Sequence, residues 1–120
     1  MEAIFMKQRA IILVPFPFSD QSGQKIRPAL VISNDTFNKT SQDLIVCSIT
    51  STFKPAQYSL IINQDDLEQG TLPSQSAIKV ENIFKIEKSL IIKTIGTLQS
   101  SAFLKVIQLV HTLLQPSVEK

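Results

Sequence analysis

The feature of this chain that most constrains its fold is a succession of short apolar runs separated by polar, turn-forming stretches. The runs are rich in isoleucine and valine, whose branched Cβ atoms favour the extended backbone of a strand. Strands are predicted over residues 11–16, 29–33, 44–49, 59–62, 76–80 and 90–98. Several short strands at this spacing are typical of a small β-barrel or β-sandwich.

The C-terminal part of the chain has a different period. Apolar residues recur there at spacings of three and four, the pattern of one buried helix face, and they are Phe103, Val106, Ile107, Val110, Leu113 and Leu114. Ser100 or Ser101 is expected to cap the start of this helix, and Pro116 to end it. Leu104 and Leu109 lie outside the stripe, where they either extend the buried face or meet a second subunit.

The connecting segments are predicted from polar and turn-forming residues. Residues 20–25 are polar and contain a glycine, so they are expected to form an exposed loop. Residues 34–43 are expected to hold a short helix or an irregular crossover, and the acidic residues 65–68 a solvated turn. Pro15 and Pro17 cannot donate to a ladder, so the first strand must end, bulge or lie at an edge there.

Length and composition indicate one folded domain spanning residues 1–120, with its core at about 7–115. The chain has 120 residues, of which 43% are hydrophobic and 18% charged, which favours a packed globule over a disordered chain. The net charge is only +2, and residues 1–60 carry six basic and four acidic side chains. This mild excess is compatible with nucleic acid binding without demonstrating it.

The sequence argues against several kinds of chemistry. Cys47 is the only cysteine, which excludes an intramolecular disulfide and favours a reducing compartment, so a cytoplasmic location is expected. His111 is the only histidine, so a single chain cannot build a two-histidine ribonuclease site or a histidine-rich metal centre. Neither a metal nor another cofactor is expected. The longest apolar run, residues 11–18, is too short to span a membrane, so no membrane association is expected.

Phosphate-binding loops and nucleophile elbows are also missing, because the three glycines form neither G-x-x-x-x-G-K-[ST] nor G-x-S-x-G.

Arg27, one of two arginines, stands immediately before an apolar strand-like run. Its planar guanidinium is suited to holding a phosphate or a carboxylate through two hydrogen bonds. The alternative is an ordinary surface or interface salt bridge.

Three segments occur in a distinctive order. Residues 15–20 read PFPFSD, residues 27–35 read RPALVISND, and residues 46–51 read VCSITS. This ordered set resembles the PemK/MazF family of toxin endoribonucleases from bacterial toxin–antitoxin pairs, and the resemblance extends from about Lys7 to the C-terminal helix. It implies an SH3-like β-barrel with a C-terminal helix, a homodimer, and neutralisation by a small antitoxin protein.

The resemblance also implies an activity, namely metal-independent, sequence-selective cleavage of single-stranded RNA by its own 2′-hydroxyl. Arg27 matches the catalytic arginine of the family and Thr50 its catalytic threonine. Arginine hardly ever loses its proton, so Arg27 is expected to clamp the phosphate, while water, Thr50, Asp20 and Glu81 remain candidates for the general base. Further RNA contacts are expected at neighbouring strand ends, from Ser19, Lys25, Asn34, Ser51 and Asn82.

The sequence departs from the family pattern in two places. Family members commonly carry a glycine and an acidic residue before the first strand, where this chain has Arg9 and Ala10. Asn82 stands where glutamine is usual. A second hypothesis is therefore a degenerate toxin that binds antitoxin or RNA without cutting. A gyrase poison of the CcdB type is disfavoured, because such toxins end in Trp-Gly-Ile and this chain has no tryptophan.

Overall fold

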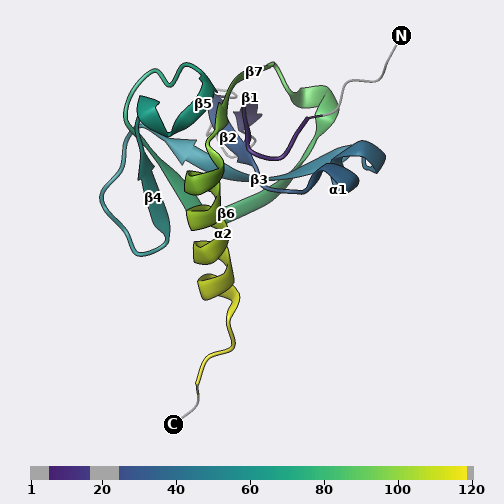
Figure 1. Cartoon of the computed structure of the whole chain (residues 1–120). Helices are drawn as coiled ribbons and strands as arrows, with labels where there is room; N and C mark the ends of the chain where they lie inside the picture. The colour runs from purple at the N-terminus through teal and green to yellow at the C-terminus, as the bar shows by residue number, and fades with distance from the viewer. Residues whose placement is uncertain (1–5, 17–24, 119–120) are drawn as a thin grey trace.

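The fold is a curled, seven-stranded sheet with a C-terminal helix (Figure 1), seen in a computed structural model that describes residues 6–16 and 25–118. Adjacent strands are antiparallel and follow the order β4-β6-β3-β2-β1-β7-β5. The strands are β1 Ala10–Phe16, β2 Lys25–Val31, β3 Asp43–Thr50, β4 Ser59–Ile62, β5 Leu67–Gly70, β6 Ser76–Glu87 and β7 Lys93–Leu98. The helices are α1 Asp35–Thr40 and α2 Ser100–Leu114, with 3₁₀ turns η1 Gln64–Asp66 and η2 Lys88–Leu90.

Apolar side chains pack on both faces of this sheet. The larger cluster includes Leu30, Cys47 and Ile49, and α2 covers it, packing mainly against β6 and β4. The second cluster, with Ile12 and Val46 among its members, lies on the opposite face. The strands are buried on both sides, which explains why their sequences read as nearly continuous apolar runs. The mainly β fold with a C-terminal helix is as predicted.

The prediction for residues 90–98 as one strand was wrong at its start, because Lys88–Leu90 form a 3₁₀ turn and β7 begins at Lys93. The acidic segment 65–68 is only partly a turn, since Leu67 is buried and begins β5. Gly70 ends β5 with φ +90°, and a Cβ there would lie 2.2 Å from the Ile95 carbonyl oxygen. Only glycine permits this approach of β5 to β7.

The other strand predictions agree with the structure in place, although β2 begins earlier and β6 continues further than expected. β1 pairs with β7 only as far as Leu13, so Pro15 lies where β1 has no partner on that side. The short helix predicted within residues 34–43 is α1, and the Asn34 side chain accepts a hydrogen bond of 2.9 Å from the Phe37 N–H. Of the predicted loop, residues 20–24 lie outside the described residues.

The start of α2 differs from the prediction. Neither Ser100 nor Ser101 caps it, because both are helical and the cap residue is Gln99, which makes no side-chain capping bond. The Gln99 N–H instead donates to the Asp66 carbonyl at 2.8 Å, and its side-chain amide to the Asp65 carbonyl at 2.9 Å. A tertiary contact with η1 thus fixes where the helix begins. The helix ends just before Pro116, as expected.

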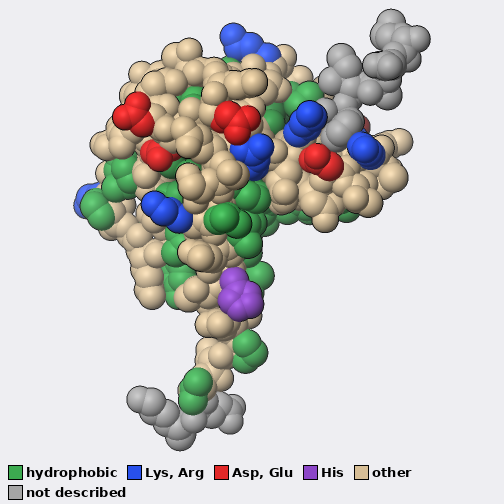
Figure 2. All heavy atoms as spheres, in the orientation of Figure 1, with side chains coloured by type: hydrophobic (Ala, Val, Ile, Leu, Met, Phe, Trp, Pro, Cys, Tyr) green, Lys and Arg blue, Asp and Glu red, His purple; other side chains and the backbone are tan. Residues whose placement is uncertain are grey.

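The apolar stripe of α2 is only partly buried. Phe103 and Val106 are in the core, and Val110, Leu113 and Leu109 pack against it. The prediction that Ile107 and Leu114 belong to the buried face was wrong, since they are 37% and 70% exposed. Leu104, left open by the sequence, is also exposed. The C-terminal half of α2 projects beyond the sheet (Figure 1), and hydrophobic side chains follow it in the space-filling view (Figure 2).

None of the helices among residues 6–16 and 25–118 is long and apolar enough to cross a bilayer.

Candidate functional site

The register of the sheet brings Arg27 and Thr50 side by side. Arg27 pairs with Val14 of β1, and on its other side β2 pairs with β3 through Ala29 and Ser48. Continuing this antiparallel register by two residues places Arg27 across from Thr50. Neighbouring strands lie about 4.8 Å apart, and residues two apart on a strand share a face. The two side chains therefore start from adjacent positions on one face of the sheet.

Both residues are half-buried and contribute to the wall of one cavity of about 200 Å³. The same cavity is lined by Ser51 and by Leu72 and Ser74, from the segment between β5 and β6. Among the described residues, the Arg27 side chain forms no ion pair or hydrogen bond. Its positive charge is thus not neutralised by another described side chain, which is what an anion-binding role requires.

The Thr50 hydroxyl is held by its own loop. It donates to the Thr52 carbonyl oxygen at 2.9 Å and accepts from the Thr52 N–H at 3.1 Å. Threonine is also stiff about χ1, so the position of this hydroxyl is well defined. To donate to a phosphate oxygen, the hydroxyl has to release the Thr52 carbonyl.

Asn82 contacts Ser48, two residues before Thr50 on β3. The pairing of β3 with β6 shifts between Cys47 and Ser48, which leaves extra residues on β6 at this point. The bulge lets the Asn82 amide donate to the Ser48 hydroxyl at 3.0 Å, and Ser48 is only 5% exposed. Because Ser48 and Thr50 are two residues apart on β3, their side chains share a face, and the Asn82 amide therefore reaches the face that carries Thr50.

The remaining predicted contact residues do not all lie here. Lys25 is exposed at the start of β2, two residues before Arg27 and on the same face. Ser51 is exposed and borders the cavity. Asn34 lies beyond the other end of β2, where it caps α1, so the structure does not bring it to the pair. Ser19 and Asp20 lie outside the described residues.

The sequence did not single out Lys79, which the structure places in this neighbourhood. Lys79 pairs with Ser48 across β3 and β6 and is half-buried. The sequence signal that could have identified Lys79 is its position between the apolar residues Ile78 and Val80, which are both buried. Glu81, two residues further along β6, is exposed.

Burial, and after it the negative charge of Glu81, raise the pKa of the Cys47 thiol to about 12, so the cysteine is a protonated core residue at neutral pH.

Arg9, one of the positions singled out in the sequence, adopts φ +79°. Its guanidinium donates to the Leu98 carbonyl at 2.8 Å and to the Glu68 carboxylate at 3.1 Å. An arginine therefore occupies a left-handed position that favours glycine, and it joins the starts of β1 and β5 to the end of β7. Arg9 is five residues from Val14, the partner of Arg27, or about 17 Å along the strand.

The curled sheet with a C-terminal helix corresponds to a defined class of small toxins. Residues 7–114 match the model of the PemK-like, MazF-like toxins of type II toxin–antitoxin systems. The chain belongs to this family.

Solved structures of such toxins have the same fold. An endoribonuclease from a mycobacterial species, in complex with its cognate antitoxin, superposes with a TM-score of 0.75 at 16% identity, covering 91% of this chain and 94% of that one. For the Mycobacterium tuberculosis toxin MazF-mt6 the TM-score is 0.71 at 18% identity, with coverages of 87% and 94%. For MazE–MazF from Deinococcus radiodurans it is 0.74 at 16% identity, with coverages of 91% and 95%. Comparison with the curated proteins gives no match.

Proposed function

We propose that this protein is a sequence-selective, metal-independent endoribonuclease toxin that cleaves single-stranded RNA. The observation that supports the proposal is that Arg27 and Thr50 line the same cavity, in a chain of the PemK-like, MazF-like toxin family. The β2–β3 pairing, continued from Ala29–Ser48, puts the two residues opposite each other. The solved structures that this fold resembles include proteins described as endoribonucleases.

In the proposed reaction, the 2′-hydroxyl of the RNA attacks the adjacent phosphorus and the 5′-oxygen of the next nucleotide leaves. The products are a 2′,3′-cyclic phosphate and a 5′-hydroxyl. Arg27 holds two phosphate oxygens through its guanidinium and stabilises the charge that develops on them. The Thr50 hydroxyl turns from the Thr52 carbonyl to donate a further hydrogen bond to the phosphate. Neither role needs a metal ion.

The RNA path is proposed to follow the face that carries this pair. Lys25 neutralises a neighbouring phosphate, Ser51 supplies a hydroxyl at the cavity edge, and Asn82 offers its amide beside Ser48. These groups can read the edges of unpaired bases, which favours single strands over duplexes. Asn34 is not part of this path, because its side chain caps α1 at the other end of β2.

Two protein partners are part of the proposal. The first is an antitoxin, since similar structures are complexes described as containing a cognate antitoxin or MazE. The second is another copy of this chain. Leu104, Ile107 and Leu114 are exposed on the projecting side of α2, and pairing of two such helices would cover them.

The test is incubation of the protein with a long single-stranded RNA in EDTA, followed by mapping of the new ends. We expect cleavage at a restricted set of sites, with cyclic phosphate and 5′-hydroxyl termini. Arg27→Ala and Arg27→Lys are expected to abolish cleavage while the protein stays folded, since an ammonium cannot make the two-pronged contact. Thr50→Ala should lower kcat by an amount equivalent to about 2–4 kcal/mol.

Lys105→Ala, which removes one positive charge from the exposed side of α2, is the matched control and should cut like the wild type. Near wild-type cutting by either Arg27 variant would refute the clamp. A wild-type protein that binds RNA or antitoxin without cutting would support the degenerate-toxin hypothesis instead. Loss of activity that follows a lower melting temperature would assign Thr50 a structural role.

A further inference from the structure

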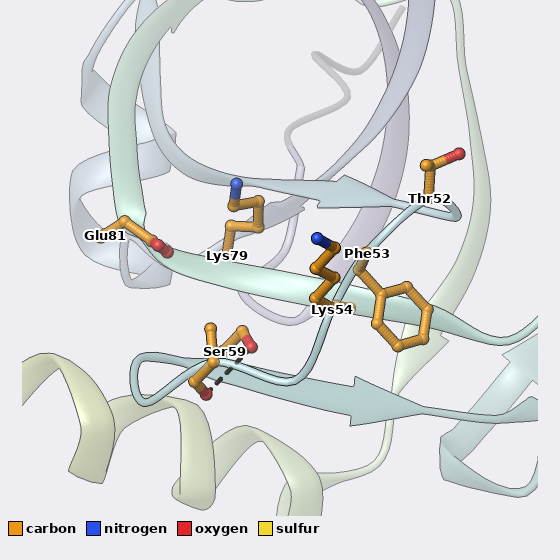
Figure 3. A pocket seen from close by; sticks show the side chains of 8 residues that line it. Thr52, Phe53, Lys54, Ser59, Lys79 and Glu81 are labelled. Atoms are coloured by element: carbon orange, nitrogen blue, oxygen red, sulfur yellow. Dashed lines mark hydrogen bonds between the residues drawn. The ribbon is translucent and has the colours of Figure 1, made fainter.

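A second and larger cavity, of about 450 Å³, lies on the same side of the sheet as the arginine–threonine pair. Figure 3 shows Lys79 and Glu81 extending from β6, Phe53 and Lys54 from the segment after β3, and Ser59 from the start of β4. The volume lies within the range of small-ligand sites and can hold one nucleotide.

The register connects this cavity to the proposed catalytic pair. Thr50 pairs with Ala77, and Ser48 pairs with Lys79, which in turn pairs with Ser59 of β4. β6, which forms the floor of the cavity, therefore lies one strand spacing from β3, about 5 Å, and two strand spacings from β2, about 10 Å. Thr52, which holds the Thr50 hydroxyl, also borders the cavity. A single nucleotide spans such a separation.

The charged side chains around the cavity are unpaired within the described part of the chain. The side chains of Lys54, Lys79 and Glu81 form no ion pair or hydrogen bond with any described residue. Two ammonium groups and one carboxylate facing the same space call for a ligand that carries both negative charge and N–H donors. The half-buried Phe53 adds an aromatic face to the wall. A nucleotide meets all three requirements, since it has a phosphate, a π face and a base edge.

We infer that this cavity is a base-specificity pocket for the nucleotide next to the cleaved bond, and that it prefers guanine. Lys54 and Lys79 bind its phosphate, Phe53 stacks on its base, and Glu81 accepts hydrogen bonds from the Watson–Crick edge. Guanine presents two adjacent donors there, N1–H and the 2-amino group, which fit a carboxylate. Adenine and cytosine present one amino group and uracil one N–H.

The inference rests on the proposed ribonuclease function, and its experiment separates the two. The wild type and Glu81→Gln cleave a pool of RNAs with randomised sequence, and the new ends are sequenced. We expect guanine to be enriched at one position beside the wild-type cut. In Glu81→Gln this enrichment should fall by about tenfold or more among the cuts that are made, as when one two-pronged base contact is lost. Phe53→Leu and Lys79→Gln should raise KM by about tenfold with a smaller change in kcat.

Glu87→Gln is the matched control, since Glu87 is an exposed carboxylate at the far end of β6, away from the cavity. It should keep the wild-type preference. Cutting without guanine enrichment, or enrichment that survives Glu81→Gln, would overturn the pocket and leave the ribonuclease intact.

A direct titration with guanosine and uridine monophosphates, followed by NMR shifts, tests the pocket without any cutting. Binding of the guanosine nucleotide that is tighter than that of the uridine one, and weaker in Glu81→Gln, is the expected result even if the chain cuts no RNA. Equal binding of the two nucleotides would refute the pocket.

Discussion

At the scale of single residues, Arg9 shows how one departure from a family pattern can be absorbed. A non-glycine residue at φ +79° carries a strain of about 1–2 kcal/mol. The guanidinium offsets this strain with hydrogen bonds to the Leu98 carbonyl and to Glu68. The ion pair with Glu68 is exposed and adds little, so the carbonyl bond matters more. The arginine at position 9 therefore affects a sheet junction and not the arginine–threonine pair.

Replacement of Arg9 tests this account. Arg9→Ala keeps the left-handed backbone and loses both hydrogen bonds, so we expect the free energy of unfolding to fall by about 2 kcal/mol. Arg9→Gly loses the same bonds but relieves the strain, and should be less destabilised by about 1 kcal/mol. Urea unfolding measures both values, and Glu68→Gln, expected to change stability by less than about 0.5 kcal/mol, is the control. A glycine variant less stable than the alanine one would contradict the strain argument.

At the scale of elements, α2 has two different apolar faces. One packs on the larger core cluster through Phe103 and Val106. The other carries Leu104, Ile107, His111 and Leu114, whose spacings of three, four and three residues are those of a coiled-coil seam. The sequence alone placed Ile107 and Leu114 on the buried stripe, because helical period does not say which side of the helix meets the sheet.

The exposed face leads to a prediction about assembly. The wild type should scatter light as a dimer at micromolar concentration, with twice the 13.4 kDa mass of the chain. Leu104→Glu and Ile107→Glu should give monomers that remain folded, because both side chains are exposed within one chain. Lys105→Glu changes charge beside this face and is the control. A wild type that remains monomeric, or glutamate variants that remain dimeric, would show that this face is not the subunit contact.

At the scale of the whole molecule, the sheet buries apolar residues on both faces, and Cys47 is part of the larger cluster. Burial, assisted by the charge of Glu81, raises the pKa of this thiol from 9.0 to about 12. The native protein therefore keeps the thiol protonated in a range where the unfolded chain ionises. The stability contributed by the neutral thiol is complete below pH 9 and is lost progressively between pH 9 and about 12.

This linkage predicts a pH dependence that one residue controls. Between pH 8 and pH 10, the free energy of unfolding of the wild type should fall by about 1.4 kcal/mol more than that of Cys47→Val, which has no thiol to ionise. Urea unfolding of both proteins at the two pH values gives the difference, and other titrating groups cancel in it. Parallel losses in the two proteins would mean that the thiol is accessible to water in the native state.

The sequence by itself determined the elements whose signal lies within a few neighbouring residues. Isoleucine- and valine-rich runs gave most of the strands, the three- and four-residue spacing gave α2, and the ordered motifs around Arg27 and Thr50 gave the family. These features depend on local backbone preference and side-chain period, which are encoded along the chain.

Only the tertiary structure decided the features that depend on pairing between distant segments. The start of α2 follows from the bonds of Gln99 to η1, and β5 exists because Gly70 can approach β7. The bulge of β6 brings Asn82 to Ser48 and sets Lys79 one strand away from β3. The register of the strands and the positions of their bulges depend on burying apolar side chains on both faces of the whole sheet. No short stretch of sequence contains this information, because it involves all the strands at once.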